Sequence, residues 1–206
     1  MTPKARPALV LVETAFLASC TTFCFLITFY FFVPLSQNFY PLPPALAYLR
    51  WGSRSSVMTV TVASLLVFIL MGPTRSLQFL IPHGLLGVLL GCLWRRGVPW
   101  AVSISLGTIV AVAGTIFQLA LLSVLIGENI WTFSIAQATN FLNWLWQVFG
   151  SLDQPDENII QFIAGLSIVA RGLINILLSH ILAWLLFDRL EVSMPAPPKW
   201  LESLLD

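Results

Sequence analysis

Charged side chains are scarce in this sequence. Only 9% of its 206 residues are Asp, Glu, Lys or Arg, whereas about a quarter of the residues in an ordinary soluble protein carry a charge. The ten Lys and Arg residues nearly balance the nine Asp and Glu residues, and they form no concentrated basic footprint for nucleic acid. This composition excludes a soluble globular domain, a disordered chain and a nucleic-acid-binding protein.

Cysteines and enzyme motifs are also scarce. The three cysteines, Cys20, Cys24 and Cys92, lie inside apolar runs, and this placement and odd number argue against a disulfide framework. The chain has no P-loop, no G-x-S-x-G motif and no H-E-x-x-H motif. His83 and His180 do not have the spacing of metal ligands, and each is expected to be a hydrogen-bonded packing residue. We therefore expect no metal site, no cofactor and no enzymatic activity.

Long apolar runs dominate the sequence instead. Hydrophobic residues make up 58% of the chain, the mean hydropathy is +0.89, and a helix needs about 20 apolar residues to cross a bilayer. The runs predict one all-α membrane domain over residues 1–206, a helix bundle with six transmembrane helices and a tail at 188–206. The predicted spans are residues 8–33, 39–50, 55–71, 77–94, 99–126 and 159–187. The second is short and proline-rich, so we expect the surrounding protein to shield its backbone.

A further apolar segment, residues 131–149, is interrupted by polar side chains on one arc of a helical wheel. They are Gln137, Asn140, Asn143 and Gln147. Trp131, Trp144 and Trp146 give the same segment the character of a membrane interface. We predict an amphipathic helix at the outer membrane surface, with a seventh crossing as the alternative.

The distribution of charge favours six crossings. With a cytoplasmic N-terminus, the inside segments carry Lys4, Arg6, Arg50, Arg54, Arg95, Arg96, Arg189 and Lys199. The outside segments carry only Arg75, and the acidic residues Glu128, Asp153, Asp156 and Glu157 precede the last span. A seventh crossing would reverse the sides of the C-terminal basic residues and the acidic group. The positive-inside rule therefore predicts a multi-pass cell-membrane protein with both termini in the cytoplasm.

Arg171, within the last predicted span, is the main candidate for a functional residue. Ser167 and Asn175 lie four residues to either side, on the same helical face. The helical rise places Arg171 roughly 25 Å from the inner boundary, in the outer half of the membrane. Since a charge in hydrocarbon is costly, one interpretation is an outward-open cavity where the guanidinium binds a carboxylate or phosphate. The alternative is a structural arginine that pairs with Asp156 or Glu157, or extends toward the interface.

Glu13 is the other charged residue within a span, near the cytoplasmic start of the first helix. We expect it to neutralise Arg6 or Arg189, to take part in an interface, or to lie at the membrane surface as an unpaired carboxylate. Small residues recur at helical spacing in three spans and predict close helix packing, inside the bundle or against a partner. They are Ala15, Ala18, Ser19 and Thr22, then Gly84, Gly87 and Gly91, then Gly107, Ala111, Gly114 and Thr115.

The order of several short motifs resembles a known family. The motifs are Pro41-Leu42-Pro43-Pro44, Gly72-Pro73, a Pro82 to Gly87 stretch leading to Arg95-Arg96, and Ala170-Arg171-Gly172-Leu173-Ile174-Asn175. This pattern resembles the YybS-like group of bacterial membrane proteins. That group is similar in turn to the substrate-binding S components of energy-coupling-factor (ECF) vitamin transporters. The resemblance covers residues 10–189.

Such a resemblance implies six helices and an outward-facing ligand cavity roofed by loops. It also implies that the first helix packs on a T-component membrane protein through an Ala-xxx-Ala motif, with ABC-type ATPases in the cytoplasm. Here Thr14, Ala15, Ala18 and Ser19 occupy that face, as Thr14-xxx-Ala18 or Ala15-xxx-Ser19, and depart from the strict motif.

Two functions therefore remain open. The first is a substrate-capture subunit of a small-molecule uptake transporter, in which Arg171, Asn175 and Ser167 bind a small anionic ligand and residues 131–149 form a lid. The second is a membrane scaffold or assembly factor without a transport role, with the Trp-rich outer helix as its contact surface. A ligand-sized cavity at Arg171 favours the first, and a filled core with a salt-bridged Arg171 favours the second.

Overall fold

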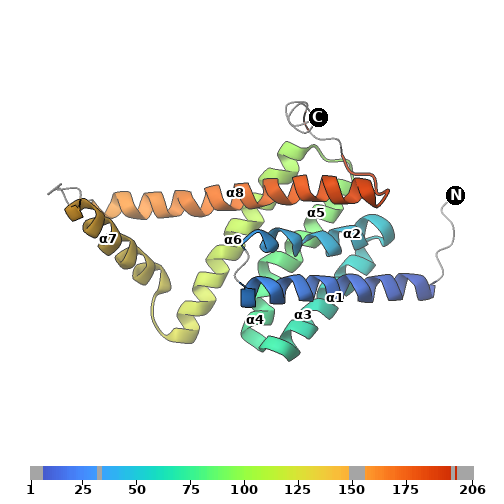
Figure 1. Cartoon of the computed structure of the whole chain (residues 1–206), viewed down its shortest axis with the longest axis horizontal. Helices are drawn as coiled ribbons and strands as arrows, with labels where there is room; N and C mark the ends of the chain where they lie inside the picture. The colour runs from blue at the N-terminus through green and yellow to red at the C-terminus, as the bar shows by residue number, and fades with distance from the viewer. Residues whose placement is uncertain (1–6, 32–33, 149–155, 196–197, 199–206) are drawn as a thin grey trace.

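The computed structural model describes residues 7–31, 34–148, 156–195 and 198, and in these ranges every regular element is helical (Figure 1). This confirms the predicted all-α membrane helix bundle. Among the described residues, five segments are long and apolar enough to cross a membrane. They are Pro7–Phe31, Ser53–Met71, Pro73–Arg95, Trp100–Ile126 and Asn158–Arg189.

The short second segment runs back along the first helix. It consists of a 3-10 turn, η1 (Pro34–Phe39), and the ten-residue helix α2 (Leu42–Trp51), and it lies antiparallel to α1 (Pro7–Phe31) (Figure 1). The hydroxyls of Thr28 and Ser36 share a hydrogen bond at one end. At the other end the Glu13 carboxylate accepts hydrogen bonds from Arg50 and, at 2.7 Å, from Trp51 Nε1. This segment therefore returns along most of α1, although α2 alone is too short to span.

The Glu13 contact corrects one expectation from the sequence. Glu13 forms an ion pair with Arg50, a partner that sequence reasoning did not name, whereas Arg6 lies outside the described residues. The reason is tertiary, because only the return of α2 along α1 brings Arg50 beside Glu13.

Small residues on the fourth predicted span allow α2 to approach closely. A Cβ atom added to Gly91 of α5 (Leu85–Arg95) would lie 2.5 Å from Tyr48 Cβ. A Cβ atom on Gly87 would lie 2.9 Å from the Pro41 carbonyl oxygen. This face therefore packs inside the bundle, against the proline-rich segment, and α2 is largely buried as predicted.

The fourth span is interrupted where it passes the middle of the bundle. It begins with α4 (Pro73–Gln78), continues through a π-helical turn, η2 (Phe79–Gly84), and ends as α5. Ile81 has non-helical torsion angles, φ −120° and ψ 105°, directly before Pro82. Interruptions of this kind often occur beside functional sites, and here the residues that flank the turn line a cavity.

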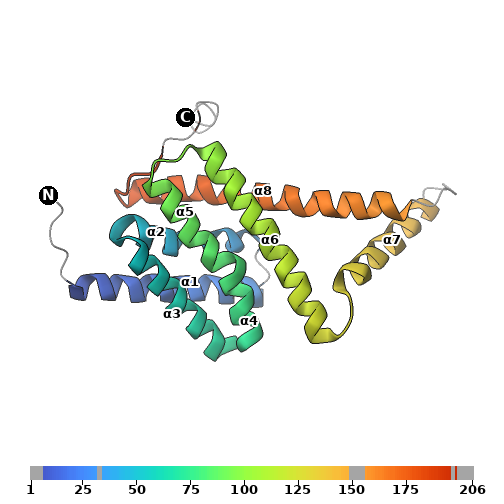
Figure 2. The same cartoon turned by 180° about the vertical axis from the view of Figure 1, so that it is seen from behind.

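The last three helices form a triangle that extends from the rest of the bundle. α6 (Trp100–Ile126) and α8 (Glu157–Arg189) pack together near Gly107 and Ile176, and then diverge (Figures 1 and 2). α7 (Ile130–Val148) connects their far ends and is not among the segments that satisfy the criteria for a membrane span. The helix occurs where the sequence predicts it, at 131–149, and its place at the outer interface stays a prediction.

Hydrogen bonds connect the helix ends that are predicted to face the cytoplasm. Arg95 Nη1 donates to the Tyr48 carbonyl oxygen at 3.1 Å, and Trp100 Nε1 donates to the Pro195 carbonyl oxygen at 2.9 Å. The ends of α2 and α5, the start of α6 and the segment after α8 therefore lie together. This grouping suits the six-crossing topology with cytoplasmic termini, which stays a prediction.

Candidate functional site

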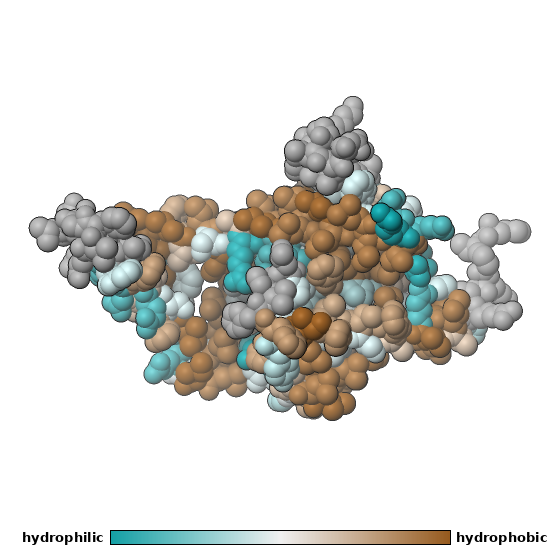
Figure 3. All heavy atoms as spheres, viewed as in Figure 1, coloured by the Kyte–Doolittle hydropathy of each residue, from teal (hydrophilic) through white to brown (hydrophobic). Residues whose placement is uncertain are grey.

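A cavity lined by polar and aromatic side chains, called the polar cavity below, lies between the first, fourth, fifth and last predicted spans, beside η1. Its volume is about 440 Å³, and a hydrophilic patch interrupts the largely apolar surface between α8 and α1 (Figure 3). The lining residues are Phe25, Thr28, Phe29, Gln37, Tyr40, Arg75, Gln78, His83, Gln118 and Arg171. An adjoining chamber of about 150 Å³ shares Gln37, His83, Gln118 and Arg171, and extends along α8 to Asn175 and Ser179.

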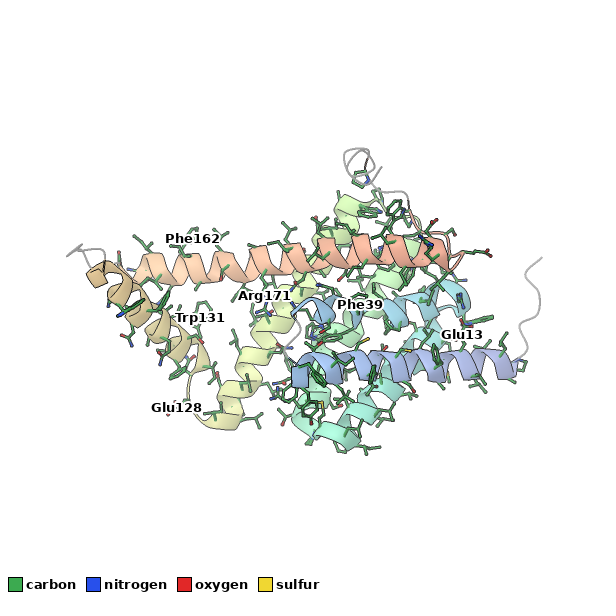
Figure 4. All side chains as sticks on the ribbon, in the orientation of Figure 1. Glu13, Phe39, Glu128, Trp131, Phe162 and Arg171 are labelled. Carbon is green, nitrogen blue, oxygen red and sulfur yellow. The ribbon has the colours of Figure 1, made fainter. Side chains whose placement is uncertain are left out.

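Arg171 stands where these two chambers meet. Figure 4 shows its side chain projecting from α8 toward the region between α6 and the end of α1. Arg171 Nη2 donates to Gln37 Oε1 at 3.5 Å, and Gln37 Nε2 donates to Asn175 Oδ1 at 3.3 Å. Two predicted site residues, Arg171 and Asn175, are therefore brought together by Gln37, which sequence reasoning missed.

Among the residues that the structure describes, no carboxylate forms an ion pair with Arg171. The ion pair found in these residues joins Arg50 and Glu13. Asp156 caps the start of α8 by accepting from the Asn158 backbone N–H at 3.0 Å. Fifteen residues of helix separate it from Arg171, which corresponds to about 22 Å. The structural interpretation that pairs Arg171 with Asp156 is therefore wrong.

Arg75 of α4 is the second cationic residue that lines the polar cavity of about 440 Å³. Its Nη1 donates to Gln78 Oε1 at 2.8 Å, and its guanidinium carbon lies 4.2 Å from the centre of the Phe29 ring. Gln78 is in turn held by Gln118, whose Nε2 donates to the Gln78 carbonyl oxygen at 3.2 Å. The sequence analysis treats Arg75 only as a charge outside the membrane, although its position two residues after the Gly72-Pro73 break could have indicated a further role.

An aromatic wall forms another side of the cavity. The Tyr40 ring lies 4.8 Å from the His83 ring and 5.4 Å from the Phe25 ring, both in edge-to-face geometry. The lining of the two chambers therefore combines two guanidinium groups, several neutral amides and hydroxyls, and apolar ring faces, and none of the described residues that line it is a carboxylate. Such a lining suits an anion, because each guanidinium group offers several hydrogen-bond donors.

Ser167, the third predicted ligand residue, does not reach this site. Its side chain is exposed, and its hydroxyl donates to the Ala164 carbonyl oxygen at 2.7 Å. Ser179 takes its place at the other end of the polar stripe, where its hydroxyl donates to the Asn175 carbonyl oxygen at 2.9 Å. Ser167 therefore lies outside the two chambers, whereas Arg171, which is also exposed, borders both of them.

The small-residue face of the first helix is divided. Thr14 and Ala18 are buried inside the bundle, and Ala18 packs in a cluster with Ala63 of α3 (Ser53–Met71). Ala15 and Ser19 remain exposed. Only the Ala15-xxx-Ser19 pair is therefore available for the predicted docking of a partner helix.

The described part of α7 does not cover the polar cavity. Trp131 instead lines a separate, mostly apolar cavity of about 760 Å³ between α6, α7 and α8, with Glu128 at one end. Figure 4 shows both residues at the turn between α6 and α7, away from Arg171. The lid expected from residues 131–149 is thus not found over the Arg171 site.

The His180 side chain is buried between helices and hydrogen-bonded there. Its Nε2 shares a hydrogen bond of 2.7 Å with the Ser103 hydroxyl, and its Nδ1 lies 2.8 Å from the Ile176 carbonyl oxygen. The ring is buried against Trp94 and Trp100. It is a hydrogen-bonded packing residue, as the sequence predicts. Within the described residues, no group of three or more potential metal ligands occurs.

The helical fold and the cavity define a polytopic helical membrane protein. The chain belongs to the family described as predicted membrane protein (DUF2232), whose model matches residues 19–203 and hence most of the sequence. No curated protein and no solved structure gave a match.

Proposed function

We propose that this protein is the substrate-capture subunit of a small-molecule uptake transporter, similar to the S components of ECF transporters. The observation that carries the proposal is Arg171, which lines a cavity of about 440 Å³ without a carboxylate partner among the described residues. Cavities of this size are typical of small-molecule sites. Capture and release would require no chemical conversion of the ligand.

The electrostatics of Arg171 favour an anionic ligand. An ionised side chain at membrane depth is costly unless a partner compensates it. The amide oxygen of Gln37, at 3.5 Å, is at the limit of hydrogen-bond length and carries no net charge. A carboxylate or phosphate group would provide both the charge and the paired acceptors that a guanidinium binds best.

The predicted topology is consistent with uptake. If the ends of α2, α5 and α8 face the cytoplasm of a bacterial cell, Arg171 lies in the outer half of the membrane, where a ligand would arrive. The exposed Ala15-xxx-Ser19 face of α1 is then the proposed contact for a T-component membrane protein. ABC-type ATPases would drive the cycle from the cytoplasmic side.

One observation favours the alternative of a membrane scaffold or assembly factor. The triangle of α6, α7 and α8 extends from the bundle (Figure 1). Its helices expose large apolar side chains. Phe162, which is 73% exposed, points away from the bundle in Figure 4. Such a surface contacts either lipid or another membrane protein.

The test combines ligand identification with partner identification. The tagged full-length protein is purified in mild detergent from native membranes, and retained small molecules and proteins are identified by mass spectrometry. We expect an anionic molecule with the wild type and with the control Arg54→Gln, its loss in Arg171→Leu, and co-purification of ABC-type ATPases. Retention of the same molecules by Arg171→Leu contradicts capture, and a stable complex with a membrane protein alone favours the scaffold.

A further inference from the structure

Two arginines from different helices line the same cavity at different places. Arg171 of α8 borders both the larger and the smaller chamber, whereas Arg75 of α4 borders only the larger one, beside Phe29. The larger chamber is therefore bordered by guanidinium groups from two different helices, and only Arg171 also borders the smaller chamber.

Neither guanidinium has a charged partner among the described residues. Arg75 is held by the neutral Gln78 oxygen, and Arg171 contacts the neutral Gln37 oxygen. Glu128 lines the separate apolar cavity, and Asp156 caps α8. The larger chamber is thus bordered by two positive charges, from the exposed Arg171 and the half-buried Arg75, and by no described carboxylate that would compensate either.

The arrangement around Arg75 positions it for a ligand. Gln78 is buried, and its contacts with Arg75 and Gln118 connect α4 to α6. The Phe29 ring supports the guanidinium through a cation–π contact. A guanidinium has five N–H donors, so the hydrogen bond to Gln78 leaves Arg75 with donors for an additional acceptor.

We infer that the ligand carries two anionic groups, one bound by Arg171 and the other by Arg75. This inference rests on the proposed function. A monoanion would compensate one cation and leave the other uncompensated in the same chamber, whereas a dianion compensates both. The body of the ligand would lie between them, against the aromatic wall of Phe25, Tyr40 and His83. The ligand class is a small organic molecule with two acidic groups, carboxylate or phosphate, on a spacer.

The test uses unbranched dicarboxylates with four to nine carbons as probes, each compared with the monocarboxylate of equal length. The full-length protein in mild detergent is titrated at fixed pH and ionic strength, and Kd is obtained from thermal stabilisation. We expect the best dicarboxylate to bind at least about tenfold more tightly than its monocarboxylate, in line with one added charge-assisted contact. One chain length should be optimal, because the two arginines have a fixed separation.

The variants distinguish this inference from the proposed function. Arg75→Gln should reduce dicarboxylate affinity to the monocarboxylate level, Arg75→Lys should keep part of the preference, and the control Arg54→Gln should behave as wild type. The dianionic ligand is contradicted if dicarboxylates and monocarboxylates bind equally well to wild type and to Arg75→Gln. Loss of binding in Arg171→Gln would then still support the capture of an anion. Failure of wild type to bind either series, or unchanged binding by Arg171→Gln, overturns both. Circular dichroism of each variant verifies that loss of binding does not reflect unfolding.

Discussion

Gln37 Oε1 lies 3.5 Å from Arg171 Nη2, and the same side chain donates to Asn175 through its Nε2 atom. One amide therefore connects η1, near the start of the chain, with two successive turns of the last helix. The polar cavity exists because η1 and α2 fold back along α1 and bring this amide beside α8. The contact with Arg171 is long and neutral, so a ligand anion can replace it at little cost.

The first prediction concerns the shape of the Arg171 side chain. Arg171→Lys keeps the charge but loses the planar fork, so anion binding should weaken by about tenfold or more while stability changes little. Arg171→Leu should abolish binding and still give expressed, membrane-inserted protein. Binding of the best dicarboxylate probe and the melting temperature are measured together. If Arg171→Leu unfolds the protein, the residue is structural and the ligand role is wrong.

The second prediction lowers the positive charge of the cavity. Gln37→Glu places a carboxylate of nearly the same shape beside Arg171, so an internal ion pair should form. We expect a higher melting temperature together with at least about tenfold weaker anion binding, because the introduced carboxylate both occupies the guanidinium and repels the ligand. Gln137→Glu, on the exposed face of α7, is the matched control and should change neither quantity. Undiminished anion binding by Gln37→Glu would show that Arg171 does not bind the anion.

The third prediction tests close packing between α5 and α2. Gly91→Ala forces a methyl group to within 2.5 Å of Tyr48 Cβ, and such overpacking typically costs about 1–3 kcal/mol. Gly165→Ala on α8 meets no atom within 4 Å, so this helix-interior glycine should gain up to about 1 kcal/mol from better helix propensity. Thermal and denaturant unfolding in detergent compare the two variants with wild type. Equal effects at both positions would contradict the observed packing.

The fourth prediction concerns the Glu13–Arg50 pair. Both side chains are partly exposed, so the ion pair should contribute only about 1 kcal/mol or less. Glu13→Gln should therefore be mildly destabilising, more so at low salt than at high salt, and should leave anion binding unchanged. A double-mutant cycle with Arg50→Gln isolates the interaction. The absence of any coupling between the two substitutions would mean that the pair does not contribute to stability.

The sequence predicts the helices better than it predicts their contacts. Apolar runs of sufficient length determine the helical fold and most helix boundaries, because lipid leaves few alternatives for the backbone. Helical spacing also relates Arg171 to Asn175. The same spacing also selects Ser167, which does not line either chamber, since periodicity along α8 does not reveal where α6 diverges from it.

The remaining cavity residues depend on tertiary structure. Gln37 enters through the return of η1, and Arg75 and Gln78 enter through the interrupted fourth span. Their positions depend on turns and helix interruptions between elements, and periodicity within a single helix carries no such information. For the same reason, the sequence analysis expects Arg6 or Arg189 as the partner of Glu13, whereas the structure pairs Glu13 with Arg50.

The last prediction concerns membrane topology and separates six crossings from seven. Glu128 precedes α7 and Asp156 follows it, so the two residues lie on the same side if α7 rests at the interface and on opposite sides if it crosses. In a variant with Cys20, Cys24 and Cys92 replaced by serine, single cysteines are introduced as Glu128→Cys, Asp156→Cys and Ser193→Cys. A membrane-impermeant maleimide is added to intact cells.

We expect both positions flanking α7 to react from outside, and Ser193→Cys to react only after the cells are permeabilised. The physical reason is the polar arc of Gln137, Asn140 and Asn143, which needs water or a polar partner that the hydrocarbon core lacks. Labelling of Asp156→Cys only after permeabilisation would establish α7 as a seventh crossing. It would also place the C-terminal basic residues outside, against the charge asymmetry on which the topology rests.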